Sequence, residues 1–424
     1  MVRSLIQFIN KSPTCYHAIS NLTSMLKDEG YQQLLPGNWE IQPGGKYYTV
    51  TGDATLIAFR IPSERPTGLM ISASHSDSPG FRIREKAVLS GDLTRLSVER
   101  YGGMLASTWF DRPLSIAGRI MIRNGEVLTR KLIDFQKDAC LIPSVAPHLD
   151  KEAANGKKLD PAVDFFPLYG NGEANFSEDL AILADCAAED ILGTDLYVYN
   201  HQPAFQWGPD GEFLSAPRLD DLACAFTCTE GFLLSHETTA IPLLCVFHNE
   251  EIGSQTRQGA DSAVLRDVLS SICQGLGLSE GDLRRMLGES IMLSCDNGHG
   301  KHPNHPELAD QNEAPGLGKG IVIKHSPRYA TDSVSSAIFS EMCNRADVPV
   351  QHYSNRPDQP GGGTLGLMAA SWAPMLCVDT GMAQLAMHSA METLATIDVE
   401  HFIRAVTAFY SVRLRSEEDT IRIY

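Results

Sequence analysis

The chain has 424 residues, 43% hydrophobic and 21% charged, a balance typical of a globular protein with room for two domains. With 52 acidic and 35 basic residues, its formal charge is −17, and such a negative field repels nucleic-acid phosphates and anionic membranes while it attracts metal cations. No apolar stretch is long enough to cross a bilayer.

The first 22 residues, MVRSLIQFINKSPTCYHAISNL, are predicted to form an amphipathic helix, because polar residues interrupt the apolar part too early for a signal peptide. The ten cysteines are scattered, without a CxxC pair. Cys224 and Cys228 are four residues apart and therefore neighbours on a helix, where burial as small apolar side chains is expected rather than a zinc site or a disulfide. These features favour a cytoplasmic protein.

Short apolar runs alternate with segments of helical periodicity in the first 85 residues and again after residue 217. The apolar runs predict buried strands at 67–74, 241–247, 290–295 and 374–381. The helical segments lie at 219–235, 262–273, 333–345 and 399–414. This alternation predicts an α/β domain in which helices cover a sheet.

The middle of the chain has a different pattern. Residues 118–133, GRIMIRNGEVLTRKLI, contain two β-rich arms around Asn124-Gly125, a pair typical of a tight hairpin turn. The stretches DLYVYN and AFQWGPDGEFL continue the β-rich composition. We therefore predict a β-rich domain at 89–216, inserted into an α/β domain that is formed by 1–88 and 217–424.

Side chains that can bind metals follow the predicted strands of the α/β domain. The carboxyl ends of strands form the crevice where open α/β sheets bind their ligands. Each such residue alone is more often a loop residue, a helix cap or a buried hydrogen-bonded group. Together they predict a metal centre, with five candidate ligands: His75, Asp220, Glu251, Asp296 and His388.

A mixture of imidazole and carboxylate ligands suits zinc or a similar divalent ion. Five ligands exceed the three of a single catalytic zinc, so the count favours two ions that share one carboxylate. The neighbouring Glu250 and Glu251 then have separate roles: Glu251 binds a metal, and Glu250 acts as the base that takes a proton from a water held between the ions. Asp77, two residues after His75, is predicted to orient the imidazole of that histidine.

Five motifs, spread over nearly the whole chain, resemble those of the M18 aspartyl aminopeptidase family of metallopeptidases. They are SHSDSPGFRIR, RLDDLACAF, NEEIGS, CDNGHGKHPNHPE and AQLAMHSAME. The resemblance implies two Zn²⁺ per subunit, for which Co²⁺ or Mn²⁺ are candidate substitutes. It also implies that His75 and Asp296 hold one ion, that Glu251 and His388 hold the other, that Asp220 bridges them, and that Glu250 is the general base.

The resemblance further implies a mixed-sheet zinc-exopeptidase-like catalytic domain with helices on both faces, interrupted by a dimerisation domain. Members of the family form tetrahedral homododecamers built from dimers. The stretch IPSVAPHLD resembles a loop whose histidine reaches the active site of a neighbouring subunit, so His148 is the candidate for that role. In IVIKHSPRYATD, which resembles the segment lining the pocket for the first side chain of the peptide, Lys324 would supply positive charge and Tyr329 would lie beside it.

The function that the resemblance implies is release of N-terminal residues, with a preference for Asp and Glu, from peptides with a free N-terminus. One alternative is another hydrolase with two metal ions, such as a carboxypeptidase or a deacylase. The other is a catalytically inactive oligomeric binding protein, which replacement of Glu250 or of a ligand would favour, and none of them is replaced.

Two further signals are interpreted as secondary. The stretch QPGGGTLG could be a phosphate-binding loop, but it lacks the Lys-Ser/Thr pair and the strand-to-helix context, and in the family it resembles a wall of the substrate cleft. His299, His302 and His305 could form a metal cluster, but the prolines between them and the five ligands elsewhere favour contacts with substrate or around the site, or plain solvent exposure.

Overall fold

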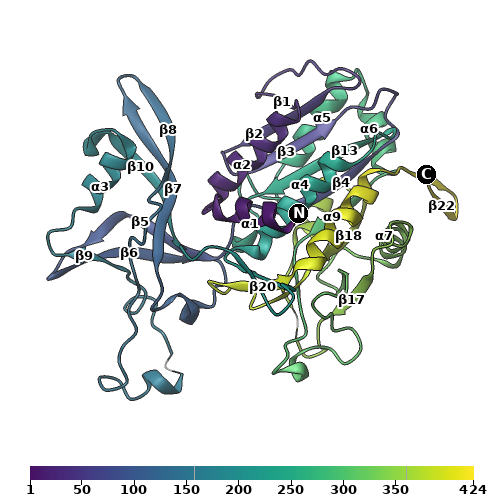
Figure 1. The fold of residues 1–424 in the computed structure, drawn as a ribbon. Coiled ribbons are helices and arrows are strands. Elements are labelled where there is room, and N and C mark those ends of the chain that lie inside the picture. The colour runs from purple at the N-terminus through teal and green to yellow at the C-terminus, as the bar shows by residue number, and fades with distance from the viewer. Residues whose placement is uncertain (157, 360) are drawn as a thin grey trace.

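The computed structural model describes residues 1–156, 158–359 and 361–424. The chain forms two lobes (Figure 1), a larger one that contains both termini and a smaller one built from the middle of the sequence. Each lobe is organised around its own sheet and its own hydrophobic core.

A nine-stranded mixed sheet forms the centre of the larger lobe, in the order β1-β2-β3-β13-β4-β14-β18-β16-β17. Strands β13, β4, β14 and β18 run parallel, whereas β3 and β16 pair with them antiparallel. Every residue of β4, β13 and β14 is buried, as expected for apolar runs covered on both faces. The strands are β1 (Gln32–Gln33), β2 (Lys46–Thr51), β3 (Thr55–Arg60), β4 (Gly68–His75), β13 (Ala240–Phe247), β14 (Ile291–Cys295), β16 (Ile321–His325), β17 (Val350–Ser354) and β18 (Leu376–Gly381).

Helices cover both faces of this sheet, which confirms the predicted α/β architecture. One apolar core lies between the sheet and α1 (Val2–Asn10), α2 (Cys15–Asp28), α4 (Leu219–Leu234), α7 (Ser333–Arg345) and α9 (Thr396–Tyr410). A second core lies on the opposite face, under α5 (Val264–Gly275), α6 (Glu280–Leu287) and α8 (Leu365–Trp372). None of the helices in the described part of the chain is long and apolar enough to span a membrane.

The prediction of a single N-terminal helix was wrong. The structure has two helices, α1 and α2, separated by residues 11–14. Pro13 lies in this break, and a proline removes a helical hydrogen bond and disfavours helical backbone in the residue before it. The cysteine prediction is confirmed, because all ten cysteines are free thiols and both Cys224 and Cys228 are buried.

The smaller lobe contains a six-stranded antiparallel sheet in the order β8-β7-β10-β5-β6-β9. The predicted hairpin at Asn124-Gly125 is confirmed: it joins β7 to β8, and Gly125 has a φ of 62°. Helix α3 (Phe176–Ala184) packs its apolar face on this sheet. The strands are β5 (Gly80–Leu89), β6 (Leu93–Tyr101), β7 (Leu114–Asn124), β8 (Val127–Asp134), β9 (Leu168–Asn171) and β10 (Ile191–Asn200).

The sheets divide the chain at other residues than the predicted 89–216. Strand β5 begins at Gly80, so the predicted boundary after residue 88 falls inside a strand of the smaller lobe. The stretch AFQWGPDGEFL forms β11 and β12, which join a five-stranded sheet with strands from the C-terminal part of the chain. The composition of a strand does not show which other strand it pairs with. The sequence therefore could not assign the hairpin of β11 and β12 to either lobe.

This third sheet has the order β11-β12-β20-β19-β15 and lies where the two lobes meet (Figure 1). Its strands are β11 (Phe205–Trp207), β12 (Phe213–Ala216), β15 (Gly298–His299), β19 (Ala383–Leu385) and β20 (Glu392–Ala395). A C-terminal hairpin consists of β21 (Leu414–Glu417) and β22 (Thr420–Ile423). Short 3-10 helices lie in the connections: η1 (Ala106–Trp109), η2 (Ala153–Asn155), η3 (Ala188–Asp190), η4 (Glu250–Ile252) and η5 (Pro306–Leu308).

Candidate metal centre

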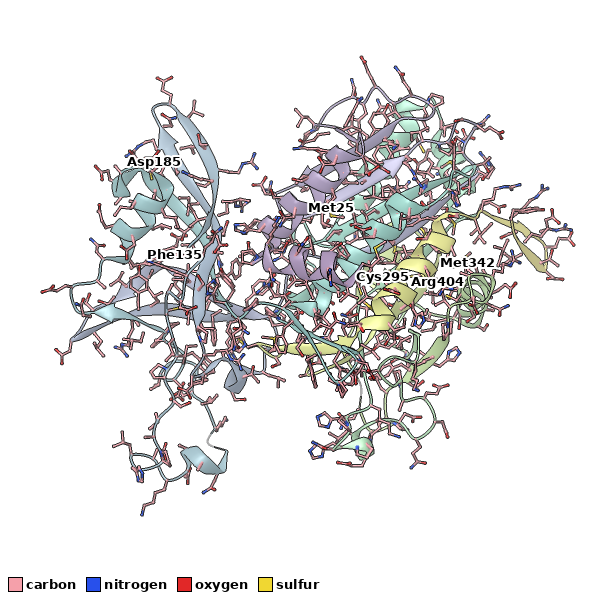
Figure 2. The ribbon with its side chains drawn as sticks, in the orientation of Figure 1. Met25, Phe135, Asp185, Cys295, Met342 and Arg404 are labelled. Atoms are coloured by element: carbon pink, nitrogen blue, oxygen red, sulfur yellow. The ribbon has the colours of Figure 1, made fainter. Side chains whose placement is uncertain are left out.

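Three neighbouring parallel strands bring candidate ligands to one edge of the large sheet. Strand β4 ends at His75, β14 is followed directly by Asp296, and β13 leads within four residues to Glu250 and Glu251 in η4. Cys295, which precedes Asp296, lies in the interior of the larger lobe (Figure 2). The buried strands therefore fix the backbone positions from which these side chains extend.

Asp220 reaches the same place from the first turn of α4. Its backbone and that of Asp221 are not helical, with φ/ψ of −86°/105° and −123°/24°. Oδ1 of Asp220 lies 3.4 Å from Nε2 of His75, and Oδ2 of Asp220 lies 3.4 Å from Nε2 of His388. One carboxylate thus lies between two imidazoles, and each of its oxygens faces a different ring.

The structure brings all five predicted ligands together. In each of two groups the ligand atoms lie within 4.8 Å of one another, and the two groups share Asp220. Nε2 of His388 is also 3.4 Å from Oε1 of Glu251. The first group is His75, Asp220, Asp221 and Asp296; the second is Asp220, Glu251 and His388.

The chemistry of this cluster fits divalent cations. Oδ1 of Asp220 and Oε1 of Glu251 are buried and have no hydrogen-bond partner among the described residues. Burial and the charge of Asp220 raise the pKa of Glu251 well above its usual value, and burial together with nearby carboxylates raises the pKa of Glu250 to about 7. Buried carboxylates this close are costly unless a positive charge compensates them, and nitrogen and oxygen donors of this kind are ligands of zinc.

The two histidines respond to the same negative field. Burial lowers the pKa of His388, but its hydrogen bond to Asp220 and the charge of Glu251 outweigh this and raise the pKa to about 10. The pKa of His75 is likewise raised, because contacts with Asp220 and Asp77 outweigh complete burial. Both shifts come from the carboxylates gathered at the centre, and a bound cation, which requires unprotonated imidazole ligands, would reverse them.

Asp77 contacts His75 in a different way from the predicted one. Nδ1 of His75 is 3.0 Å from the backbone carbonyl oxygen of Asp77, whereas the nearer carboxylate oxygen is 3.6 Å away. The carboxylate instead accepts hydrogen bonds from the backbone N–H groups of Glu250 and Glu251, both at 3.2 Å, and from the hydroxyl of Tyr101 at 2.7 Å. Asp77 therefore orients the imidazole through its carbonyl and holds the glutamate turn through its side chain.

Two buried carboxylates beside the centre were missed by the sequence reasoning. Oδ2 of Asp221 accepts a hydrogen bond from the backbone N–H of His75 at 3.2 Å. Glu392 accepts hydrogen bonds from the backbone N–H groups of His388, at 2.6 Å, and Asp220, at 3.0 Å. Both residues could have been noticed in the sequence, because an acidic side chain within a ligand motif is close enough along the chain to contact that ligand. Asp221 is the second aspartate of RLDDL, and Glu392 is the last residue of AQLAMHSAME.

Lys324 lies beside the metal centre and not on the surface. It is 2% exposed, and its Nζ is 3.5 Å from Oδ2 of Asp296 and 5.8 Å from the ring centre of Tyr329. Burial disfavours the ammonium, but the charge of Asp296 outweighs burial and raises the pKa of Lys324 above its ordinary value. The lysine therefore carries a positive charge next to a predicted metal ligand.

His148 is not part of this cluster. It is exposed in the long connection between β8 and β9, which extends away from the sheet of the smaller lobe (Figure 1). Within the described part of this chain, the groups of ligand atoms close enough to share an ion do not include it. Any role of His148 at a metal centre therefore requires another subunit.

The two secondary signals lie outside the groups of candidate ligands in the described part of the chain. His299, His302 and His305 are exposed; the rings of His302 and His305 are 5.3 Å apart, and His305 pairs with Glu307 at 3.1 Å. Pro360 of QPGGGTLG lies outside the described residues, and Thr364 of the same stretch donates a hydrogen bond to the buried Asp379.

Comparison with known proteins identifies relatives over the whole chain. Residues 8–410 match the family described as "Aminopeptidase I zinc metalloprotease (M18)". The chain is 35% identical over 423 residues to a probable M18 family aminopeptidase 2 of Clostridium novyi, covering 96% of this chain and 98% of that protein. It is 36% identical over 425 residues to a protein of the same name from Clostridium acetobutylicum, covering 97% and 98%.

A solved structure shares the same fold. The S. cerevisiae mApe1 dodecamer superposes with a TM-score of 0.84 at 27% identity, covering 96% of this chain and 95% of that one. The combination of a mixed α/β sheet with an antiparallel β-sheet domain is therefore common to both proteins.

Proposed function

Because this chain belongs to the M18 family of zinc aminopeptidases, we propose that it releases the first residue of peptides, with a preference for Asp and Glu, at a centre of two zinc ions bridged by Asp220. His75 and Asp296 would hold one ion, and Glu251 and His388 would hold the other. Co²⁺ or Mn²⁺ would be accepted by the same nitrogen and oxygen donors.

The position of Asp220 is the observation that carries this proposal. Its two oxygens face two different histidines at 3.4 Å each, and it belongs to both groups of ligand atoms. A carboxylate that served a single ion would not need an imidazole opposite each oxygen. Two-metal hydrolases use such a shared ligand to keep their ions close together.

Glu250 is proposed as the general base. When bound, the two ions would polarise the scissile carbonyl and lower the pKa of water toward neutrality. Glu250 lies with His75 and Glu251 in a third group of close ligand atoms, and Asp77 holds its backbone in place. Its carboxylate would take a proton from the attacking water and deliver it to the leaving amine.

Lys324 is proposed to select acidic first residues. The side chain is buried, positively charged and next to Asp296, so the carboxylate of a substrate bound at the ions would come within its reach. Tyr329, under the ammonium, would contribute an aromatic wall. A charge-assisted hydrogen bond in a site closed to water is one of the stronger polar interactions available for this recognition.

We further propose that the chain forms dimers and, from them, a dodecamer like that of the yeast relative, in which His148 reaches the centre of a partner subunit. The apolar side chains exposed on the smaller lobe support an interface there: Leu149, next to His148, is 85% exposed, and Val127 and Leu128 on the edge strand β8 are 63% and 57% exposed. Burial of such side chains between subunits is favourable.

A panel of peptides tests the proposed function. After chelation and addition of zinc, the enzyme should release amino acids from peptides with a free N-terminus, fastest from those that begin with Asp or Glu. N-acetylated versions of the same peptides are the matched control. Hydrolysis of the acetylated peptides, or release of C-terminal residues, would indicate a deacylase or a carboxypeptidase instead.

A further inference from the structure

Glu392 connects two metal ligands that are far apart in the sequence. It is the first residue of β20, at the junction of the lobes, and it is 1% exposed. Oε2 accepts the backbone N–H of Asp220 at 3.0 Å, and Oε1 accepts the backbone N–H of His388 at 2.6 Å. Asp220 lies in the first turn of α4 and His388 in the connection between β19 and β20, so no single strand or helix sets the distance between them.

Both of these backbone groups lie in irregular structure. His388 has a φ of 66°, in the left-handed region that non-glycine residues rarely adopt, and Asp220 lies in the non-helical start of α4. A buried N–H group without an acceptor is destabilising. The carboxylate of Glu392 provides an acceptor for both groups and thereby holds the two backbone segments at a fixed separation.

The side chains of the same two residues face each other across the centre, with Nε2 of His388 3.4 Å from Oδ2 of Asp220. By contrast, His75 is the last residue of β4 and Asp296 directly follows β14, and these two strands pair with each other in the sheet. The ends of two paired strands therefore position His75 and Asp296, whereas one side chain, that of Glu392, accepts the backbone N–H groups of both Asp220 and His388.

We propose that Glu392 is a positioning residue that fixes Asp220 and His388 as one unit, so that metal binding at the position of Glu251 and His388 depends on it more than binding at the position of His75 and Asp296. The inference rests on the two-metal centre of the proposed function. The role requires a carboxylate, because two N–H donors need two acceptors. A glutamine has the same size but offers one acceptor and turns an NH₂ group toward the other donor.

Metal retention tests this role directly. Zinc-loaded Glu392→Gln is dialysed against increasing chelator, and the zinc left per chain is measured by elemental analysis. Loss of a hydrogen-bond partner behind a ligand typically costs 10–100-fold in metal affinity. We expect one zinc to leave at about 10–100-fold lower chelator strength than from the wild type, while the other zinc is released as in the wild type.

Asp398→Asn is the matched control. Asp398 is also fully buried and also accepts two backbone N–H bonds, from Gly318 at 2.7 Å and Gly320 at 3.0 Å, but it belongs to none of the close groups of candidate ligands. The Asp398→Asn variant should lower thermal stability, as Glu392→Gln does, but should retain zinc like the wild type. If both variants retain zinc like the wild type, or if Glu392→Gln loses both ions together, the selective role of Glu392 is refuted.

Double variants assign the weakened position. In Asp296→Ala, which keeps the Glu251–His388 position, adding Glu392→Gln should reduce the remaining zinc affinity; in His388→Ala, which keeps the other position, it should change little. Equal effects in both backgrounds would contradict the proposal. If Glu392→Gln does not fold, Glu392→Asp takes its place in the same titration, because its shorter side chain withdraws both oxygens from the two N–H groups. The same selective loss of one zinc is expected, and wild-type retention or joint loss of both ions would refute the role. A wild type that binds only one zinc would instead refute the two-metal centre.

Discussion

The two lobes place their candidate functional residues in different surroundings. In the larger lobe, residues from five separate segments converge on one buried centre, and His75, Asp220 and Asp296 are all at most 8% exposed. In the smaller lobe, His148 is exposed in a long connection, beside a leucine that is 85% exposed. All five candidate ligands thus come from one chain, whereas the contribution proposed for His148 would depend on a second subunit.

This difference predicts that variants of the larger lobe act on their own subunit and that variants of the loop around His148 act on a partner. The variants below test the contrast, beginning with the largest expected effect.

Asp220→Ala should abolish turnover and remove both zinc ions, because the bridging carboxylate serves both positions. Zinc per chain, measured after dialysis of the variant, should fall from two toward zero. Asp221→Ala, which alters the adjacent buried carboxylate, is the control and should retain at least one ion. One ion fully retained in Asp220→Ala would contradict the bridge.

Glu250→Gln should lower kcat by about 10²–10⁴-fold, the usual contribution of a general base. Zinc content should stay near that of the wild type, because the base does not hold an ion. The neighbouring variant Glu251→Gln provides the contrast, since it should lose zinc as well as activity. A Glu250→Gln enzyme with a near-normal rate would remove Glu250 from the mechanism.

We propose that the imidazole of His148, placed at a partner's centre, would stabilise the oxyanion that develops on the scissile carbonyl. His148→Ala should therefore lower kcat by about 10²–10³-fold, the typical cost of losing one such donor. Zinc content, folding and assembly should be unchanged, and His236→Ala, at another exposed loop histidine, should have little effect. Mixing His148→Ala subunits with Glu250→Gln subunits should restore part of the activity that each parent lacks. If proven subunit exchange restores nothing, the smaller lobe does not act across the interface.

Lys324→Met should lower kcat/KM for peptides that begin with Asp or Glu about 10-fold more than for those that begin with Leu or Ala, because a hydrogen bond to a charged group contributes roughly 1.5–3 kcal/mol. The exposed Lys301→Met is the control. An equal loss for every peptide would mean that Lys324 acts through its 3.5 Å contact with Asp296 and not on the substrate.

The sequence was most informative where function depends on strand ends. His75, Glu251 and Asp296 follow apolar runs that could be recognised as buried strands, so their convergence could be predicted from the parallel sheet alone. Asp220, at the start of a predicted helix, and His388, after the last predicted strand, were also expected at the centre, although both lie on irregular backbone that no periodicity describes. The break between α1 and α2 at Pro13 was also readable from the sequence, and was overlooked.

Non-local hydrogen bonds could not be predicted in the same way. Glu392 contacts the backbone of Asp220, 172 residues away, and Asp77 uses its carboxylate on the glutamate turn and its carbonyl on His75. These choices depend on how segments meet in three dimensions. The same holds for β11 and β12, whose composition predicts strands but whose partner β20 comes from the C-terminal part of the chain.

The number of zinc ions that full activity requires tests the central claim most directly. The chelated wild-type chain is titrated with zinc, and both bound metal and peptide hydrolysis are measured at each step. Two bound ions per chain, with full activity reached only when both positions are filled, is the result that the shared carboxylate of Asp220 predicts. Saturation of both binding and activity at one ion per chain would contradict it.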